Sequence, residues 1–222
     1  METALVWQNL KKLVESYLHR RARAYLLVFL LFSLGACGGV LSLGYLPSDD
    51  LTALSGQLDT FVTSLRTAGG QVNQQVLLEL SLLSHVRTVF LFWLLGATIV
   101  GLPLVLGLVL AEGFSSGFAA GIMVSHFGLN GVFLAGLTLL PKSLLAVPAL
   151  LLAAVSSLSF SLLLLRTGLG WRPANLLQEF LAYSLLQFLA GMVFLLASLV
   201  ESLVVPVFLR NVWPYLTLGG RF

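Results

Sequence analysis

Glu112 and the glycines that follow it are the residues whose types and spacing first suggest chemistry. The stretch 112–121, EGFSSGFAAG, places Gly113, Gly117 and Gly121 at intervals of four directly behind this acid. A phosphate-binding loop needs such glycines after a strand, followed by lysine and then serine or threonine at fixed spacing. The stretch contains no lysine, so we exclude a phosphate loop and expect no cofactor.

The other polar residues are too scattered to suggest a catalytic or metal site. The histidines, His19, His85 and His126, show no metal-ligand spacing. The acids after the first long apolar run are expected on exposed helix faces, where their role is solvation: Asp49, Asp50, Asp59 and Glu79. We therefore expect a protein that is not an enzyme and holds no metal.

The composition indicates a membrane protein. Apolar residues make up 58% of the 222-residue chain and charged residues only 9%, and the mean hydropathy is +0.99. A chain of this kind cannot expose its surface to water, so we expect the lipid bilayer as its partner and no nucleic acid. The net charge of +3 is then an orientation signal.

Five uncharged runs are each long enough to cross the hydrocarbon core, which needs about 20 residues. The predicted fold class is all-α, a polytopic membrane bundle of about five helices with a short, broken third span. Basic residues precede the first run and Asp49 and Asp50 follow it, which predicts a cytoplasmic amino terminus. We expect spans at 24–46, 88–111, 113–141, 143–165 and 180–203, with a cytoplasmic loop at 166–179.

The amino-terminal segment, 1–23, has the pattern of a basic amphipathic helix. Its apolar stripe comprises Leu10, Leu13, Val14, Tyr17 and Leu18, with lysines and arginines on other faces. We expect it to lie on the inner leaflet of the membrane. A partner-binding helix would show the same stripe, and the sequence does not separate the two interpretations.

The stretch LGAC, residues 34–37, imitates the end of a lipoprotein signal, whose cysteine would be lipidated after cleavage. The residues after Cys37 remain apolar, however, where a mature lipoprotein turns polar. The segment ahead of Cys37 is also longer than the usual signal of about 15–30 residues. We therefore expect Cys37 to stay inside the first span.

Residues 47–87 are the only long soluble stretch and are predicted to form an extracytoplasmic helical hairpin. Ser48 can cap its first helix, and AGG at 68–70 can end it. This helix carries one apolar face, which could lie on the membrane or receive a partner: Leu51, Leu54, Leu58, Phe61 and Leu65.

The third run, 113–141, is too long for one straight span, and GLNG at 128–131 supplies a break. Its two pieces either lead to the next span or fold back as a re-entrant pair. Glu112 is expected in an inner turn before it, because a charge inside the membrane is unfavourable.

Small residues are predicted to mediate helix packing around this turn. Gly113, Gly117 and Gly121 form one helix face, which could contact a helix of the same chain or of a second copy in a homodimer. Gly101 and Pro103 lie inside the second predicted span, where proline leaves a carbonyl without its donor, so we expect that side to face protein. The carboxy-terminal residues, 204–222, contain Trp213 and Tyr215 and suit an extracytoplasmic interface.

Residues 91–165 resemble the stage II sporulation protein M (SpoIIM) family. The resemblance depends on an ordered series of small and kinking residues: Trp93, Gly96, Gly101, Pro103, Gly113, Gly117, Phe118, Gly131, Pro141 and Pro148. The chain length, the basic amino-terminal segment and the extracytoplasmic segment predicted at 47–87, called the outer segment below, also agree with this family. The family pattern has a polar pair directly after the proline that corresponds to Pro141. This chain has Lys142 and Ser143 at those positions.

The resemblance implies a multi-pass protein of the mother-cell membrane of a sporulating bacterium, needed for engulfment of the forespore. SpoIIM-like proteins act as scaffolds of a peptidoglycan-degrading machine, in which SpoIID-like and SpoIIP-like partners do the cutting. The competing interpretation is a permease-like transporter subunit coupled to a cytoplasmic ATPase. The absence of ionisable residues within the predicted spans, apart from His126 near a span end, argues against transport.

Overall fold

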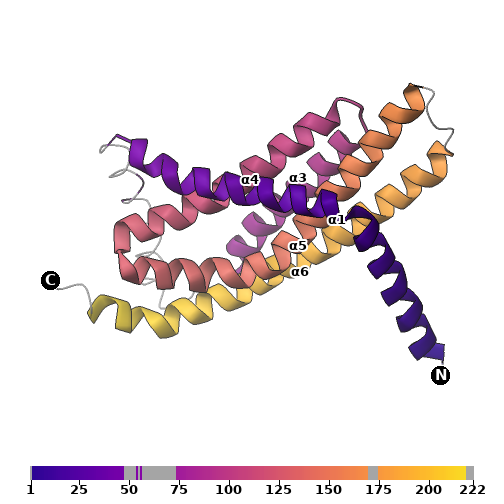
Figure 1. Ribbon diagram of the computed structural model, residues 1–222. Coiled ribbons are helices and arrows are strands. Elements are labelled where there is room, and N and C mark those ends of the chain that lie inside the picture. Colours follow the sequence, from indigo (N-terminus) through magenta and orange to yellow (C-terminus); the bar gives the residue numbers. More distant parts are fainter. Residues whose placement is uncertain (1, 48–53, 55, 57–73, 170–174, 219–222) are drawn as a thin grey trace.

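Long helices make up the protein in a computed structural model, which describes residues 2–47, 54, 56, 74–169 and 175–218 (Figure 1). The described elements are all helical, which confirms the predicted all-α fold. They are α1 (Glu2–Ser42), the 3-10 turn η1 (Leu43–Tyr45), α3 (Gln74–Gly96), α4 (Gly101–Phe127), α5 (Leu129–Gly168) and α6 (Leu176–Leu218).

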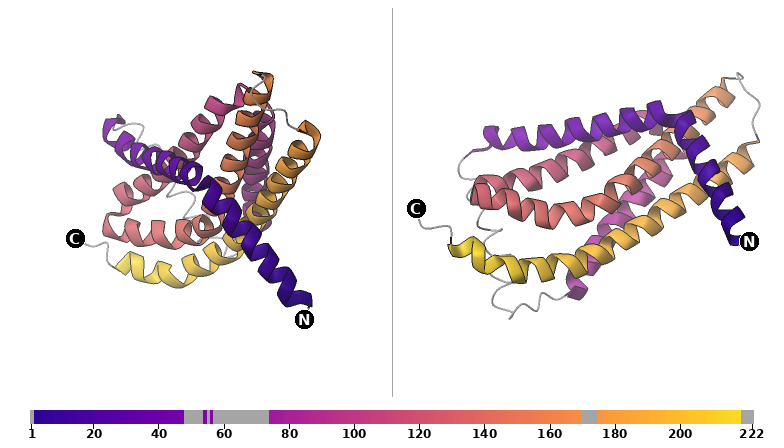
Figure 2. Two further views of the ribbon diagram at one scale, coloured as in Figure 1. Left: turned by 45° about the vertical axis from the view of Figure 1, so that its right-hand side comes forward. Right: turned by 60° about the horizontal axis from the view of Figure 1, so that its bottom comes forward.

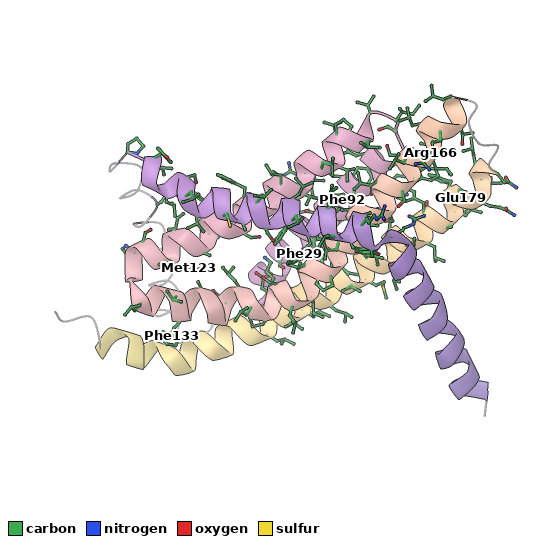
Figure 3. All side chains as sticks on the ribbon, in the orientation of Figure 1. Phe29, Phe92, Met123, Phe133, Arg166 and Glu179 are labelled. Carbon is green, nitrogen blue, oxygen red and sulfur yellow. The ribbon has the colours of Figure 1, made fainter. Side chains whose placement is uncertain are left out.

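The direction of the helices alternates along the chain. Helices α1, α4 and α6 run one way and α3 and α5 the other, as their contacts along the sequence require. Figure 3 shows Arg166 and Glu179 together at one end of the bundle and Met123 and Phe133 toward the other. Within the described residues, four helical segments are long and apolar enough to cross a membrane, and Ser81–Gly96 is a shorter apolar segment. Five crossings therefore remain a prediction.

Helices α1 and α4 approach each other so closely that their backbones touch. A Cβ atom placed on Gly117 would collide with the Ala36 carbonyl oxygen and lie 2.7 Å from Ala36 Cα. The same backbone approach recurs along both helices, at Gly113 against Phe32, Gly35 against Leu110 and Gly39 against Phe114. Gly121 instead makes room for the side chain of Leu43. The predicted glycine face thus packs on a helix of the same chain, and glycines of α1 lie in the same interface.

The chain turns sharply between α3 and α4, at 97–100. The Trp93 and Thr98 carbonyl oxygens accept the backbone N–H groups of Ala97 and Gly101, and side chains of α5 and α6 supply further donors to carbonyl groups at the end of α3 and in the turn. Tyr183 Oη lies 2.9 and 2.8 Å from the carbonyl oxygens of Phe92 and Trp93, so its one hydrogen can be donated to either, and Ser161 Oγ donates to the carbonyl oxygen of Thr98 at 2.6 Å. The predicted span 88–111 is therefore divided between two helices, and these hydrogen bonds hold the turn against α5 and α6.

Gly101 and Pro103 lie in the first turn of α4, directly after this turn. The packing role predicted for Pro103 is wrong because this residue is exposed, whereas Gly101 is buried. A Cβ atom on Gly101 would collide with the carbonyl oxygen of Leu95 in the last turn of α3, so this glycine lets the start of α4 lie directly against the end of α3. In the first turn of a helix, the backbone N–H of any residue lacks an acceptor within the helix. Proline, which has no N–H, is therefore tolerated there without a kink.

The break predicted at 128–131 is observed at Gly128, between α4 and α5. Gly128 has φ of +58°, a left-handed value that side chains disfavour. Gly131 then passes so close to α4 that a Cβ atom there would collide with the Met123 carbonyl oxygen. The glycines thus let the two helices turn back on each other directly.

Helix α5 continues through Pro141 and Pro148, so the predicted boundary between separate spans at 141–143 is wrong. Its 40 residues extend about 60 Å, twice the roughly 30 Å hydrocarbon core. Figure 2 shows that the helix is bent, as internal prolines require. The second piece of the predicted third span is thereby the start of α5.

The two ends of the chain are also helical. Residues 2–23, expected as a separate helix, are the start of α1 and leave the bundle at an angle (Figure 2). Helix α6 extends to Leu218, through most of the predicted tail 204–222. The predicted outer hairpin falls mainly on residues outside the described ones, although its second helix is continuous with α3 from Gln74.

Apolar side chains occupy both the interior and the outside of the bundle. The interior core includes Val28, Phe92, Val105, Val109 and Ala154, all fully buried. Many leucines point outward, such as Leu34, Leu83, Leu185 and Leu189. An apolar exterior around an apolar core is what a lipid environment requires.

We predict that Gly117→Ile destabilises the protein because its side chain would drive α1 away from α4. Overpacking of this kind typically lowers the free energy of unfolding by about 1–3 kcal/mol. Thermal unfolding in detergent measures the effect. Gly107→Ile is the matched control in the same helix, because a Cβ atom there meets no neighbour. Equal unfolding temperatures for the two variants would contradict the packing role.

Cysteine labelling in intact cells tests the crossings. In a Cys37→Ser background, we predict that a membrane-impermeant maleimide labels Leu129→Cys directly and Thr98→Cys only after permeabilisation. The reason is that the two exposed turns lie at opposite ends of α4. Labelling of both from outside, or of Thr98→Cys alone, would contradict an α4 that crosses from the cytoplasm outward.

Candidate functional site

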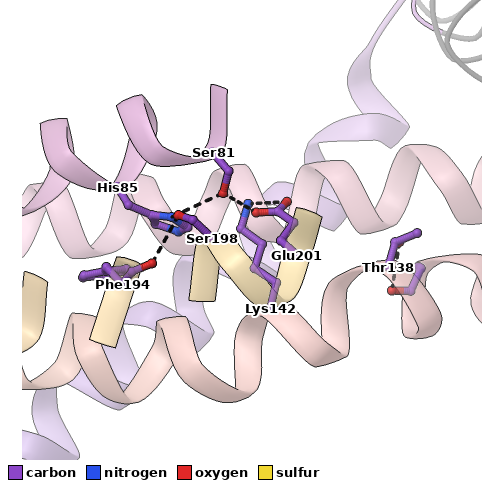
Figure 4. Close-up of polar contacts among 8 residues, drawn as sticks. Ser81, His85, Thr138, Lys142, Phe194, Ser198 and Glu201 are labelled. Atoms are coloured by element: carbon purple, nitrogen blue, oxygen red, sulfur yellow. Dashed lines mark hydrogen bonds and ion pairs between the residues drawn. The ribbon is translucent and has the colours of Figure 1, made fainter. Parts of the chain in front are cut away.

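An ion pair lies among the helices and joins α5 to α6 (Figure 4). Lys142 Nζ is 3.0 Å from Glu201 Oε1, and Ser81 Oγ of α3 donates a hydrogen bond to Glu201 Oε2 at 2.5 Å. Figure 4 shows the three side chains converging from three helices. The Glu201 carboxylate therefore has a partner on each oxygen, as a charge in an apolar setting requires.

His85 extends this cluster along α3. Its Nδ1 atom is 2.7 Å from Ser198 Oγ and 3.5 Å from Ser81 Oγ, and its ring stacks on Phe194. The hydroxyl of Ser81 donates to Glu201, and that of Ser198 can donate to the Phe194 carbonyl oxygen at 3.2 Å. Nδ1 is then the donor to the serine oxygens, so the fitting tautomer carries its hydrogen on Nδ1.

Glu112 lies near the middle of α4, so the predicted inner turn at this residue is wrong. The helix is continuous from Gly101 to Phe127. The carboxylate points to α3, where Thr88 Oγ1 donates to Glu112 Oε1 at 2.8 Å. A polar partner inside the bundle, rather than a turn at the surface, accommodates the charge.

A cavity of about 840 Å³ lies next to these polar groups. Helices α1, α3, α4 and α5 form most of its wall, and Phe194 of α6 contributes. Glu112, Lys142 and His85 line it together with several serines, while the rest of the wall is mostly apolar. The arrangement suits an amphipathic occupant, which would meet charged and apolar surfaces at once.

The sequence interpretation missed the cluster of Lys142, Glu201 and His85. Lys142 lies at the boundary between two predicted spans, and Glu201 lies inside the predicted span 180–203, so the premise that the spans lack ionisable residues is wrong. A signal was present in the spacing: Ser81 and His85 are four residues apart and Ser198 and Glu201 three apart, so each pair shares one helix face.

The remaining predicted site residues give less information. Leu54 is helical and partly buried, and the other residues of the predicted partner surface, Leu51, Leu58, Phe61 and Leu65, lie outside the described residues. Cys37 lies in α1, exposed, on the wall of the cavity. Over the described part of the chain, no three histidine, cysteine, aspartate or glutamate side chains gather closely enough to hold a metal ion.

The helices and their apolar exterior define the class of the protein as a polytopic helical membrane protein. A family model described as stage II sporulation protein M matches residues 28–206, which include the packed part of α1 and most of α6. The match covers well over half of the chain, so the chain belongs to this family and is a membrane protein related to sporulation. No significant match was found among curated proteins or solved structures.

A double-mutant cycle measures the ion pair. We predict that Lys142→Met and Glu201→Gln each destabilise the protein and that the double variant loses less than their sum. The expected coupling is about 0.5–3 kcal/mol, as for residues in direct contact. It should fall in the lower half of that range, because the two side chains remain 32% and 22% exposed.

Unfolding titrations in mixed detergent micelles give the free energies for this cycle. Arg166→Met is the control, since Arg166 is an exposed cation at the far end of α5. Strict additivity of the Lys142 and Glu201 changes would show that the two side chains do not interact.

Proposed function

We propose that the protein is a non-catalytic membrane scaffold that assembles wall-degrading proteins while the mother cell engulfs the forespore. Family membership is the observation that carries the proposal, because the matched residues, 28–206, take in most of the packed helical frame. The partners on this proposal are SpoIID-like and SpoIIP-like proteins, which cut peptidoglycan outside the mother-cell membrane.

The geometry supports this role by fixing both ends of the outer segment. At one end, Leu43 of η1 is buried and packs against Gly121 of α4. At the other, Ser81 of α3 is hydrogen-bonded to Glu201 of α6. A segment anchored on both sides to one rigid frame can present a partner surface in a constant position relative to the membrane.

The contact between α1 and α4 also bears on assembly. The glycine face of α4 is occupied by α1 of the same chain, so it is not free for a second copy. A homodimer, which stays a prediction, would have to use another surface. The outward leucines of α6, Leu181, Leu185 and Leu189, form the sort of face that remains for it.

A transporter subunit coupled to a cytoplasmic ATPase is the second candidate. The cavity and its charged residues favour it, because transporters place their sites among ionisable groups inside the membrane. The expected ATPase contact at Glu112 no longer supports it, since this residue lies in mid-helix. The exposed turn at 97–100 would be the contact on this alternative.

Affinity purification from membranes of sporulating cells separates the two functions. We predict that the tagged protein recovers SpoIID-like and SpoIIP-like proteins, and that Leu58→Ala combined with Phe61→Ala lowers their recovery about tenfold or more, as loss of apolar anchors does. Leu83→Ala is the control, because Leu83 is an outward-facing leucine on α3. Recovery of an ATPase with stimulated turnover, without wall-degrading proteins, would contradict the scaffold.

A further inference from the structure

The cavity beside Glu112 is a local pocket rather than a groove along the bundle. On α4 its wall runs from Glu112 to Ala120, a rise of about 12 Å. That is less than half of the roughly 30 Å hydrocarbon core. A partner helix would need a groove along most of the membrane, so the shape fits a compact group with an apolar extension.

Glu112 and Lys142 are the charged residues that line this cavity, and only Lys142 has a counter-ion in an ion pair. Lys142 is paired with Glu201, so its charge is already compensated. The carboxylate of Glu112 receives a hydrogen bond from Thr88, and among the side chains that the structure describes no lysine, arginine or histidine forms an ion pair with it. A carboxylate in the middle of a membrane helix favours a cation beside it. The group that complements the cavity is therefore a cationic donor.

A primary ammonium group meets both requirements. It carries one positive charge and three N–H donors, and a charge-assisted hydrogen bond to a carboxylate is about twice as strong as a neutral one. Hydroxyls on the same wall, from Ser84, Ser115 and Ser143, are placed to accept or donate further hydrogen bonds. Apolar side chains such as Phe32 and Leu150 line the rest of the wall and suit a hydrocarbon body.

We propose that the cavity binds an amphiphile bearing a primary ammonium group, with the ammonium at Glu112 and its apolar part along α1 and α5. This site goes beyond the scaffold role, because a scaffold of wall-degrading proteins need not bind a small molecule. The ammonium can belong to a phospholipid head group, as in phosphatidylethanolamine, or to a free amine.

Cys37 provides the reporter, since it is the only cysteine of the chain, is exposed and lines the cavity. The purified protein is treated with a maleimide in the presence of phosphatidylethanolamine, phosphatidylglycerol with the same acyl chains, or ethanolamine. The two lipids share phosphate and chains and differ in the ammonium. We expect phosphatidylethanolamine to slow alkylation of Cys37 at about tenfold lower concentration than phosphatidylglycerol, a ratio equivalent to ~1.4 kcal/mol.

Glu112→Gln preserves the shape and the acceptor for Thr88 but removes the charge, so it should abolish the preference between the two lipids. Glu179→Gln, an exposed acid at the start of α6, should retain it. Native mass spectrometry of the lipid adducts repeats the comparison independently of Cys37. Protection by ethanolamine alone would identify a free amine as the source of the ammonium.

Three results would overturn the site. The first is equal protection of Cys37 by the two lipids, and the second is an unchanged lipid preference in Glu112→Gln. The third is that, in membranes, the protection of Cys37 depends on binding of a partner protein helix and not on the lipid. None of them depends on whether wall-degrading proteins are recovered with the chain, so the failure of this site and of the scaffold are distinguishable.

Discussion

The contact between α1 and α4 is the interaction on which the rest of the structure depends. Five glycines, three on α4 and two on α1, remove the side chains that would hold the backbones apart. The two helices run parallel, so the contact extends from Phe32 of α1 to Leu43 of η1. Lipid tails are as apolar as leucine, and close van der Waals packing is then a main source of helix association in a membrane. The wall of the cavity formed by α1 and α4 exists only because of this approach.

A second constraint is that polar groups in an apolar setting must find partners inside the bundle. At one level the Glu201 carboxylate forms an ion pair with Lys142 and accepts a hydrogen bond from Ser81. At another level the Phe92 carbonyl oxygen, near the end of α3, accepts hydrogen bonds from Tyr183 and Ser157. These two networks bind α3 to α5 and α6, while the glycines bind α1 to α4. The frame is thus assembled by packing on one side and by hydrogen bonds on the other, and Glu112 lies where the sides meet.

Local features of the sequence predicted much of this fold. Apolar runs predicted a helical bundle, and GLNG predicted the break that Gly128 makes, because a left-handed backbone is a local requirement. The spacing of Gly113, Gly117 and Gly121 predicted a contact face, but its partner depends on tertiary structure. Two errors share one cause: Glu112 and Lys142 suggest turns at the membrane surface, whereas each has a partner on another helix of the bundle. The turn at 97–100 was missed because its donors come from α5 and α6.

Cross-linking between α1 and α4 in native membranes is the most direct test of the frame. Cys37 and residue 116 line the same cavity from these two helices, so a short bifunctional reagent should link Cys37 to Ser116→Cys. Two differently tagged copies are expressed together, and the products are separated by size. A frame closed within one chain predicts an internal link and a product of monomer size. Cross-linked dimers that carry both tags, without the internal link, would show that α4 meets α1 of a second copy.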